Sequence, residues 1–449
     1  MTTSTSINGV RQWRRYPAYK DSGVLWLKAI PSEWKAVRLK FLASFCGGGT
    51  PSKENAEFWK GEIPWVSPKD MKVEYVEDTE DHITEAAVAN SSTRLIPVGV
   101  VLVVVRSGIL RHSIPVAISK KTMALNQDMR AIMPKGSIQA EYLAAVIRGH
   151  QTALLTEWCK QGATVESIEV EYLTNTPFPV PTLDEQHRIV AFLNQETAKI
   201  DAMIAKKERL IDLLQEKRTA LISRAVTKGL DSTVPMKESG VEWLGDIPES
   251  WNLARNKILF REIDDRSVSG DEELLTVSHI TGVTRRSEKP DVTMFLAETL
   301  EGYKKCKTGD VVVNTMWAFM GALGTAFVPG VVSPSYNVYR LRDESRLDPR
   351  FLDLLYRTPL YKAQVFRYSK GVWHSRLRLY PEAFFEIMTI VPSLCEQRRI
   401  VDHVGSIVEE EDRKLTLLQE SIDRLREYRI ALISAAVTGK IDVREEVEP

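Results

Sequence analysis

The sequence has few of the features that mark secreted, membrane-spanning or metal-binding proteins. It has four scattered cysteines: Cys46, Cys159, Cys306 and Cys395. They form no CxxC pair, so we expect structural thiols in a reducing cytoplasm and no zinc site. No apolar run approaches the roughly 20 residues that a membrane-spanning helix needs. The first residues, MTTSTSINGVRQWRRY, contain no apolar signal core, so we expect no export.

Motifs of catalysis are missing as well. There is no GxxxxGK[ST] phosphate loop, no GxSxG and no HExxH, and the GGG at 47–49 is followed by Thr-Pro, which does not begin a helix. No FxGxG and no Asn-Pro-Pro-aromatic tetrapeptide occurs, which disfavours a self-contained adenine methyltransferase. Carboxylate pairs such as Asp264–Asp265 are typical of solvated loops. Nothing in the sequence predicts a catalytic centre.

A net positive charge is also lacking, because 60 Lys and Arg balance 60 Asp and Glu. That balance argues mildly against a nucleic-acid ligand, since phosphate binding needs cations. The charge is segregated, however. No acidic residue occurs from Val98 to Gln127, a stretch that contains two arginines and two lysines. The stretch RYSKGVWHSRLRLY, at 367–380, also lacks acids and mixes cations with aromatic residues.

The chain contains two copies of one pattern. SGVLWLKAIPSEW at 22–34 and SGVEWLGDIPESW at 239–251 share eight of thirteen positions. LIDLLQEKRTALISRAVT at 210–227 and SIDRLREYRIALISAAVT at 421–438 share twelve of eighteen. VPTLDEQHRIV at 180–190 likewise matches VPSLCEQRRIV at 391–401. The order is therefore A-B-C-A′-B′-C′, where A is the SGVxWLxxIPxxW motif and C the long segment that follows the VPxL motif.

The C segments predict long helices. Apolar residues recur at spacings of three and four, close to the 3.5-residue period of a coiled coil. Pro181 and Pro392 mark the entries, and Thr227-Lys-Gly and Thr438-Gly mark the exits. About 43 residues would make a rod of roughly 65 Å, and its single apolar stripe needs a partner. We expect an antiparallel pair of C and C′; the alternative is that each helix folds back on its own B segment.

The B segments predict two divergent copies of one α/β fold. Short apolar strands (VGVVLVVV, PVAIS, GDVVVNTM, GTAFVP) accompany predicted helices at 140–155 and 349–366. A and C are close copies whereas B and B′ differ. This contrast indicates one task performed on two different targets.

The motifs, in this doubled order, are those of a known family. They are GGTPSKENAEFWKGEIPWVSPKDM at 48–71, the two VPxL motifs, RTALISRAVTKG, RIALISAAVTGKID and the doubled SGVxWLxxIPxxW. NQDMRAIMP at 126–134 and SPSYNVYRL at 333–341 look like two versions of one later core strand. The chain resembles the specificity subunit of Type I restriction-modification systems over nearly its whole length. The second domain departs from the pattern, because it lacks GTPSK and carries LLTVSHITGV at 274–283.

The resemblance implies a non-catalytic subunit that binds double-stranded DNA at a bipartite target, one half-site per domain. It implies that the helical pair sets the spacer and docks two methyltransferase subunits, which methylate adenine N6 with S-adenosylmethionine. Restriction subunits would add translocation and cleavage that use ATP and Mg²⁺. No cofactor and no membrane are expected for this chain itself. The alternatives are a coiled-coil scaffold that presents two protein-binding domains, or a minimal DNA-modifying enzyme without a recognisable cofactor motif.

The expected fold class is α+β: two α/β target recognition domains separated by two long helices in an antiparallel coiled coil, with pseudo-twofold circular symmetry. The expected parts are an N-terminal segment (1–35), domain 1 (36–181), a central helix (182–235), the repeated segment (236–252), domain 2 (253–392) and a distal helix (393–449). We expect the A segment at 19–34 to pack near 430–442, anchored by its tryptophans as core residues.

Residues shared by family members of different specificity cannot select bases, so Gly48, Thr50, Pro51 and Trp65 are expected to be framework. The candidate DNA-binding residues are cations, aromatics and polar residues in the acid-poor stretches and nearby loops, because arginine is the usual reader of guanine. In domain 1 they are Lys53, Lys69, Arg106, Ser107, Arg111, His112, Lys160, Gln161 and Thr164. In domain 2 they are His279, Arg285, Arg286, Lys370, Trp373, His374, Arg376 and Arg378.

Overall fold

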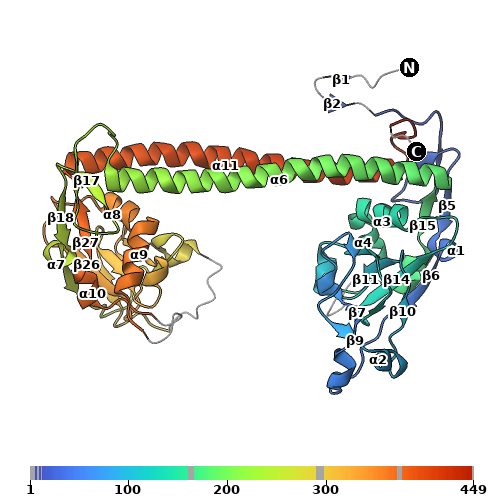
Figure 1. Cartoon of the computed structure of the whole chain (residues 1–449), viewed down its shortest axis with the longest axis horizontal. Coiled ribbons are helices and arrows are strands. Elements are labelled where there is room, and N and C mark those ends of the chain that lie inside the picture. The colour runs from blue at the N-terminus through green and yellow to red at the C-terminus, as the bar shows by residue number, and fades with distance from the viewer. Residues whose placement is uncertain are drawn as a thin grey trace. The chain divides into compact units, whose positions relative to one another are not determined.

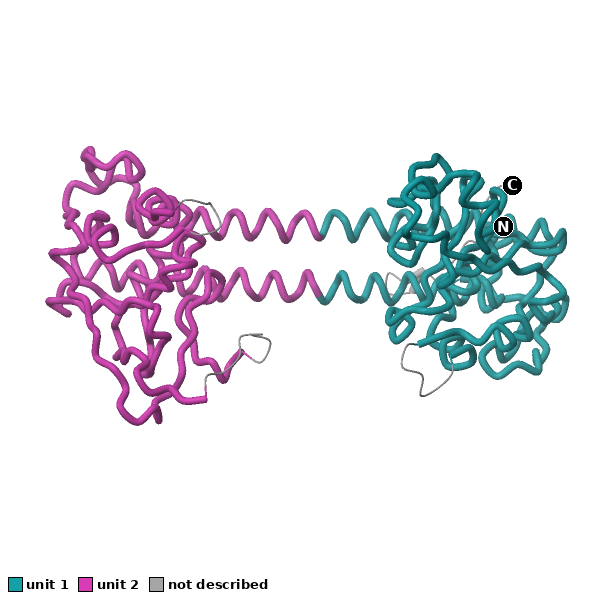
Figure 2. Tube along the Cα trace, turned by 90° about the horizontal axis from the view of Figure 1, so that it is seen from below, with its two compact units in different colours: residues 1–207, 420–449 teal, residues 208–419 magenta. Residues whose placement is uncertain are grey.

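The computed structural model describes residues 6–7, 10–11, 13–159, 166–289, 298–371 and 377–446. The chain divides into two compact units (Figure 2). Unit 1 comprises residues 1–207 and 420–449, and unit 2 comprises residues 208–419. The two long helices, α6 (Leu183–Lys228) and α11 (Leu394–Val437), each contribute one part to each unit. Both begin two residues after the predicted prolines and end at the predicted threonine–glycine exits.

Unit 1 contains an α/β domain between Lys35 and Val180 (Figure 1). Its central sheet has the order β6-β14-β11-β12-β8, and a second sheet has the order β10-β13-β7-β9. The strands of unit 1 are β1 (Ser6–Ile7), β2 (Val10–Arg11), β3 (Tyr19–Asp21), β4 (Ala29–Pro31), β5 (Lys35–Arg38), β6 (Ala43–Gly47), β7 (Ile63–Val66), β8 (Tyr75–Val76), β9 (His82–Ile83), β10 (Leu95–Ile96), β11 (Val101–Val104), β12 (Val116–Ser119), β13 (Met123–Leu125), β14 (Met129–Pro134) and β15 (Pro177–Val180). The short helices are α1 (Leu39–Leu42), η1 (Ala56–Trp59), η2 (Pro68–Asp70), α2 (Glu85–Ala89), η3 (Gly108–Arg111), α3 (Ala140–Gly149), α4 (Gln151–Trp158) and α5 (Val170–Asn175).

Unit 2 contains a second α/β domain, between Asn252 and Val391. Its central sheet has the order β19-β26-β23-β24. The strands are β16 (Met236–Glu238), β17 (Asp246–Pro248), β18 (Asn252–Arg255), β19 (Phe260–Ile263), β20 (Leu275–Ser278), β21 (Gly282–Arg285), β22 (Lys304–Cys306), β23 (Val311–Val313), β24 (Leu323–Thr325), β25 (Gly330–Val332), β26 (Asn337–Leu341) and β27 (Met388–Val391). The short helices are α7 (Asn256–Leu259), η4 (Arg286–Glu288), η5 (Ala318–Met320), α8 (Pro349–Tyr356), α9 (Pro359–Tyr368) and α10 (Pro381–Glu386).

The two domains share one frame, as the divergent copies predicted. The order β6-β14-β11-β12 corresponds to β19-β26-β23-β24, with antiparallel pairing throughout both. The central strands β11 and β23 are continuous valine-rich runs whose residues are all buried. Such runs suit strands that are covered on both faces, which explains why these segments form the middle of each sheet.

The helices predicted at 140–155 and 349–366 are each broken in two, so the expectation of single helices is wrong. In the first domain α3 ends at Gly149, where a side chain would lie about 3.1 Å from the backbone of Ser434 on α11. In the second, Pro359 begins α9 after the cap Thr358, whose hydroxyl accepts a hydrogen bond from the Tyr361 amide. Proline at a first helical position cannot continue the preceding helix, because it has no amide donor.

The long helices pair with each other, antiparallel, inside each unit. In unit 1 Arg429 on α11 binds Asp201 on α6, with Nε to Oδ1 at 2.9 Å. In unit 2 Arg218 on α6 binds Asp412 on α11 at 2.6 Å. The two ion pairs are duplicates of one another, because each partner lies 211 positions from its counterpart. Both helices also bury apolar residues in the core of the adjacent domain. The long helices therefore pair with each other and also pack on the α/β domains, so both arrangements expected from the sequence occur together.

A buried glutamine joins each long helix to its domain. Gln186 accepts a hydrogen bond from the Gln139 amide at 2.9 Å and donates to the Ser137 and Pro181 carbonyls. Gln397 repeats this pattern with the Asp348 amide and the Arg346 and Pro392 carbonyls. Both side chains are fully buried. Each glutamine therefore fixes the entry of a long helix against the start of α3 or α8.

The A segments pack where the circular arrangement predicted. Gly439, at the end of α11, has a positive φ of +70°, and a Cβ there would lie 2.4 Å from Pro31 and 3.3 Å from Trp34. Gly229, at the end of α6, has φ +81° and lies beside the corresponding residues, with a Cβ there 3.8 Å from Pro248 and 3.4 Å from Trp251. Trp34 and Trp251 are buried, which confirms core packing rather than base stacking for these anchors.

One buried charge interrupts the helix pair in unit 2. Glu411 on α11 is 4% exposed and occupies the position that Ile200, also buried, holds in the first copy. Its Oε1 binds Lys414 at 3.2 Å, while its Oε2 has no hydrogen-bond partner among the described residues. Burying a carboxylate with one unpaired oxygen costs stability.

We predict that Gly439→Ala lowers the free energy of unfolding by about 2–4 kcal/mol, because a left-handed alanine is strained and its Cβ overlaps Pro31. The matched variant Gly229→Ala has its nearest contacts at 3.4 Å, so it should cost only about 1 kcal/mol. Urea unfolding followed by circular dichroism measures both. Equal losses would contradict the close packing of Pro31 on Gly439.

We predict that Glu411→Ile raises the free energy of unfolding of unit 2 by about 1–2 kcal/mol, since an apolar side chain replaces a poorly satisfied carboxylate. Glu410→Ile is the control, because Glu410 also binds Lys414 but is exposed. Thermal unfolding should show the gain for the first variant alone. A destabilised Glu411→Ile protein would mean that the carboxylate is satisfied in solution.

Candidate nucleic-acid interface

Unit 1 has an open groove of about 720 Å³ at the edge of its α/β domain. Its walls are the 71–74 turn, the η3 loop, the start of α4 and the helix α11. The cations and histidines along it are Lys72, His112, Arg148, His150 and Arg429, against the single carboxylate of Glu74. This sign of charge suits a phosphate backbone.

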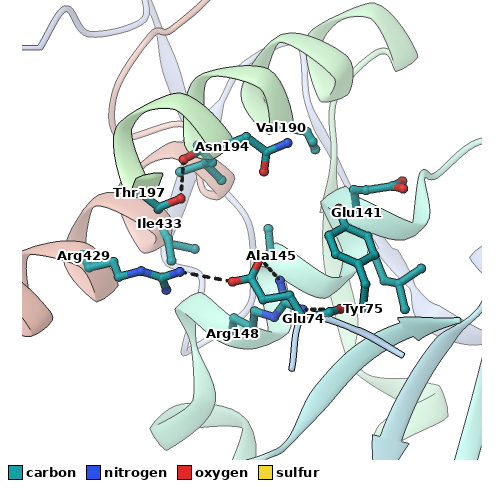
Figure 3. A pocket seen from close by; sticks show the side chains of 12 residues that line it. Glu74, Tyr75, Glu141, Ala145, Arg148, Val190, Asn194, Thr197, Arg429 and Ile433 are labelled. Atoms are coloured by element: carbon teal, nitrogen blue, oxygen red, sulfur yellow. Dashed lines mark hydrogen bonds and ion pairs between the residues drawn. The ribbon is translucent and has the colours of Figure 1, made fainter. Parts of the chain in front are cut away.

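Two of these arginines belong to a structural contact (Figure 3). Glu74 lies between Arg148 on α3, at 3.5 Å, and Arg429 on α11, at 3.1 Å. The surrounding cavity holds only about 40 Å³, too small for a nucleotide. Burial lowers the pKa of Arg148, whereas for Arg429 the bonds to Asp201 and Glu74 outweigh burial and raise the pKa. This ion-pair cluster holds the domain on the helix pair and is not a free binding site.

Four of the predicted residues gather at the η3 loop, at the mouth of the groove. The Arg106 Nε donates to Asp128 at 2.6 Å, and the Arg111 Nε donates to Glu166 at 2.8 Å. Ser107 caps η3 by accepting from the Ile109 amide, and His112 follows the helix as an exposed residue. The bond from Arg111 is the largest cause that lowers the pKa of Glu166. The Ser107 cap and the two carboxylates therefore hold the loop in place, while its cationic side chains remain exposed to solvent.

The remaining predicted residues of the first domain differ in their surroundings. Lys53 is exposed. Lys69 binds both Glu80 and Asp81 at 2.9 Å, and these two bonds raise its pKa. Its ammonium is therefore already neutralised and makes a poor phosphate contact. Three further residues, Lys160, Gln161 and Thr164, lie outside the described residues.

In the second domain the predicted residues form two separate groups. His279 lies exposed at the tip of the β20–β21 hairpin, Arg285 ends β21, and Arg286 donates to the Lys289 carbonyl. Lys370 and Arg378 exchange two backbone hydrogen bonds of 2.9 Å and are both exposed. Trp373, His374 and Arg376 lie outside the described residues.

Sequence reasoning missed an apolar surface on the η5 loop. Met316, Trp317 and Met320 are 40%, 49% and 41% exposed. In the sequence these residues belong to the apolar run TMWAFMG, and a run of that composition indicates a buried core segment rather than an exposed surface. The expected framework residues, in contrast, pack inside the first domain: Trp65 donates to the Gly49 carbonyl at 3.0 Å, and any side chain at Gly48 would overlap the Leu125–Asn126 backbone.

Over the ranges that the structure describes, no group of three His, Cys, Asp or Glu is placed to hold a metal ion, and no helix is long and apolar enough to cross a membrane. The cysteines form no disulfide. Burial raises the pKa of the Cys306 thiol to about 12, so it is an inert core residue.

Comparison with known proteins agrees with this arrangement. Residues 31–211 match the family described as Type I restriction modification DNA specificity domain. The chain is similar to specificity subunits of Type I restriction enzymes. One relative, the EcoR124I/EcoR124II specificity subunit of Escherichia coli, is 40% identical over 45% of this chain and 50% of its own length. Another, the MjaIX specificity subunit of Methanocaldococcus jannaschii, is 32% identical over 42% of both chains.

The chain thus spans about half the length of the curated relatives that it matches. A solved structure of a type I restriction-modification system covers 91% of this chain and 98% of its own, with a TM-score of 0.57 and 15% identity. At that identity the likeness concerns the fold, and it includes the second α/β domain, which the family match does not reach. The expected fold of two α/β domains with two long helices is confirmed.

We predict a pH-dependent loosening of unit 1 that depends on His150. Burial lowers its pKa from 6.5 to about 4, and its ring contacts the Val146 carbonyl and, at 2.9 Å, the Ser434 hydroxyl on α11. Between pH 6.5 and 4 the unfolded chain binds this proton and the folded chain does not. Stability is therefore complete above pH 6.5 and falls as the pH drops towards 4, by on the order of 3 kcal/mol.

Urea unfolding of unit 1 from pH 7.5 to 4.5 measures this slope. His150→Gln should flatten it, and the exposed His187→Gln should leave it unchanged. An identical pH profile in the wild type and His150→Gln would show that other groups govern acid stability.

Proposed function

We propose that this chain is a DNA-recognition subunit of a Type I restriction-modification system, without a catalytic centre of its own. The observation that carries the proposal is the presence of two α/β domains with one frame and different loops. Residues 31–211 match a DNA specificity domain, and the second domain repeats its sheet order. A shared frame with different loop chemistry suits two different base sequences.

The loops supply the means for contacting DNA. In the first domain the η3 loop presents exposed arginines, and the exposed Lys72 and His112 line the neighbouring groove. In the second, Lys370 and Arg378 are exposed and lie near the loop that follows β23, because the neighbouring Leu379 amide donates to the Thr315 carbonyl. Side chains that reach base edges specify sequence, and cations on phosphates fix position. The zero net charge is compatible with DNA binding if partner subunits share the phosphate contacts.

The target we propose is bipartite, with one half-site for each domain, and the paired helices set the spacer between them. A stiff helix pair holds a length, whereas a flexible linker does not. The proposed partners are methyltransferase subunits, which would modify adenine at N6 with S-adenosylmethionine, and restriction subunits that use ATP and Mg²⁺. The helices expose Leu210, Leu213 and Leu417 in unit 2, apolar side chains that a partner could cover.

The test is a methylome comparison in a host that carries the chain together with its methyltransferase subunit. We expect one split N6-methyladenine motif that is present with the chain and absent without it. A matched strain that carries the methyltransferase subunit alone is the control. Unchanged methylation in the presence of both proteins would overturn the proposal and favour a scaffold that binds two proteins.

A second experiment tests the spacer. One heptad is inserted into both helices, after Lys207 in α6 and after Gln419 in α11, so that the antiparallel register is preserved. Seven residues add about 10 Å, so the spacer should lengthen by up to about three base pairs while both half-sites stay the same. An unchanged spacer would mean that the helices do not set it.

A further inference from the structure

The two domains present corresponding loops beside the central sheet. Loop 1 (Val105–His112) follows β11 and contains η3, and loop 2 (Thr315–Gly321) follows β23 and contains η5. The Ile168 amide donates to the Val105 carbonyl at 2.8 Å, and the Leu379 amide donates to the Thr315 carbonyl at 3.1 Å. The same two elements therefore meet in both domains, and loop 2 is the structural counterpart of loop 1.

The two arginines of loop 1 are each held through a single nitrogen. Arg106 and Arg111 each use Nε for a carboxylate, from Asp128 and Glu166 respectively. Their side chains are 55% and 62% exposed, while the carboxylates are only 22% and 27% exposed. No partner of either pair of terminal nitrogens is found among the described residues. In each arginine the carboxylate fixes the guanidinium through Nε, and the terminal nitrogens remain available to donate to a ligand.

Two other arginines of this chain use more of their nitrogens for the fold. Arg340 binds Asp310 through both Nε and Nη2 at 2.7 Å, and Arg357 uses all three nitrogens on Asp353 and two carbonyls. Such an arginine keeps fewer terminal nitrogens for a ligand. Arg342 and Arg413, in contrast, are held through Nε as the loop 1 arginines are, but on backbone carbonyls. The single-nitrogen anchoring in loop 1 leaves the geometry that matches two adjacent acceptors.

Loop 2 has no arginine at these positions. Met316 corresponds to Arg106, Trp317 corresponds to Ser107, and Met320 lies at the end of η5. All three are 40% or more exposed, although loop 2 is fixed by the Trp317 amide on the Asn314 carbonyl and by Gly321 at φ +98°. A fixed loop that holds large apolar side chains in water offers contact to an apolar group of a ligand.

We propose that loop 1 reads guanine and that loop 2 reads thymine. The terminal nitrogens of Arg106 and Arg111 would donate to the O6 and N7 acceptors of guanine in the first half-site. Met316, Trp317 and Met320 would contact the C5 methyl group of thymine in the second. Guanine is the base that presents two adjacent acceptors in the major groove, and thymine is the base that carries a methyl group there. The inference rests on the proposed DNA-recognition function.

The guanine half of the proposal is tested with the chain in complex with its methyltransferase subunit. Binding is measured on duplexes in which single guanines of the first half-site are replaced by 7-deazaguanine, which lacks the N7 acceptor. Wild type should lose roughly 10–100-fold in affinity at one or two positions. Arg111→Lys keeps the charge but loses the fork, so it should lose the sensitivity at the guanine that Arg111 contacts and keep any sensitivity that is due to Arg106. Arg94→Ala, an exposed arginine outside loop 1, should behave as wild type.

The thymine half is tested by deoxyuridine, which removes only the methyl group. Substitution in the second half-site should weaken binding about fourfold for each contacted methyl, and substitution in the first should not. Trp317→Ala should remove this sensitivity, whereas Phe327→Ala, an exposed aromatic outside loop 2, should retain it. Met316→Arg should shift the preferred base in the second half-site towards guanine.

The results distinguish a failure of the proposed DNA-recognition function from a failure of the guanine or thymine assignment. If wild type binds no split motif, the proposed function itself fails. If a split motif is bound but the loop 1 variants weaken all sequences equally, the arginines contact phosphate and the guanine assignment is wrong. If deoxyuridine has no effect in the second half-site, or Trp317→Ala leaves that effect intact, the thymine assignment is wrong.

Discussion

The buried glutamine at the start of each long helix is the contact on which the rest of the structure depends. Gln186 and Gln397 each bind one backbone amide and two backbone carbonyls, and both glutamine side chains are fully buried. An apolar residue there would leave those groups unpaired, at a cost of about 1–3 kcal/mol for each. With the amide in place, the helix entry, the connecting turn and the first residues of α3 or α8 form one rigid joint. The joint fixes the direction in which each helix leaves its domain.

Within each domain, the contacts that hold the frame are separate from the loops that differ between the two copies. The sheet order, the A segment and the helix pairing are held by contacts that occur twice, such as Arg429–Asp201 and Arg218–Asp412. The loops beside β11 and β23 are held only by a few backbone bonds and by local side chains. Their exposed residues can therefore change without a penalty to the core. The contrast between two arginines in one loop and two methionines with a tryptophan in the other is such a change.

The repeat made much of this fold predictable from sequence. Periodicity and terminal signals located both long helices, and the doubled tryptophan motif located the packing at Gly439 and Gly229. The break at His150 was not predicted, because the amphipathic pattern continues through it and the packing of Gly149 on Ser434 decides it. The break at Pro359 had a local signal, the proline itself, but the helical spacing on both sides hid it. The candidate site was predictable only in part. Charge singled out Arg106, Arg111 and Lys69 as candidates, but it did not predict the carboxylates that bind them, because those partners lie eleven or more residues away in the sequence. The exposure of Trp317 could not be predicted from the sequence, because its apolar neighbours in the chain indicate a buried segment.

The division of the chain into units has a consequence for its synthesis on the ribosome. Unit 2 is one continuous stretch, but unit 1 needs two stretches with the whole of unit 2 between them. Its core includes Leu432, Ile433, Ala436 and Val437, which emerge long after Trp34 and Tyr142, the residues they join. Domains usually fold in the order in which they are made. Here the first domain must wait, with part of its apolar surface uncovered, until the second has been completed, so the later-made half is the first that can close its core.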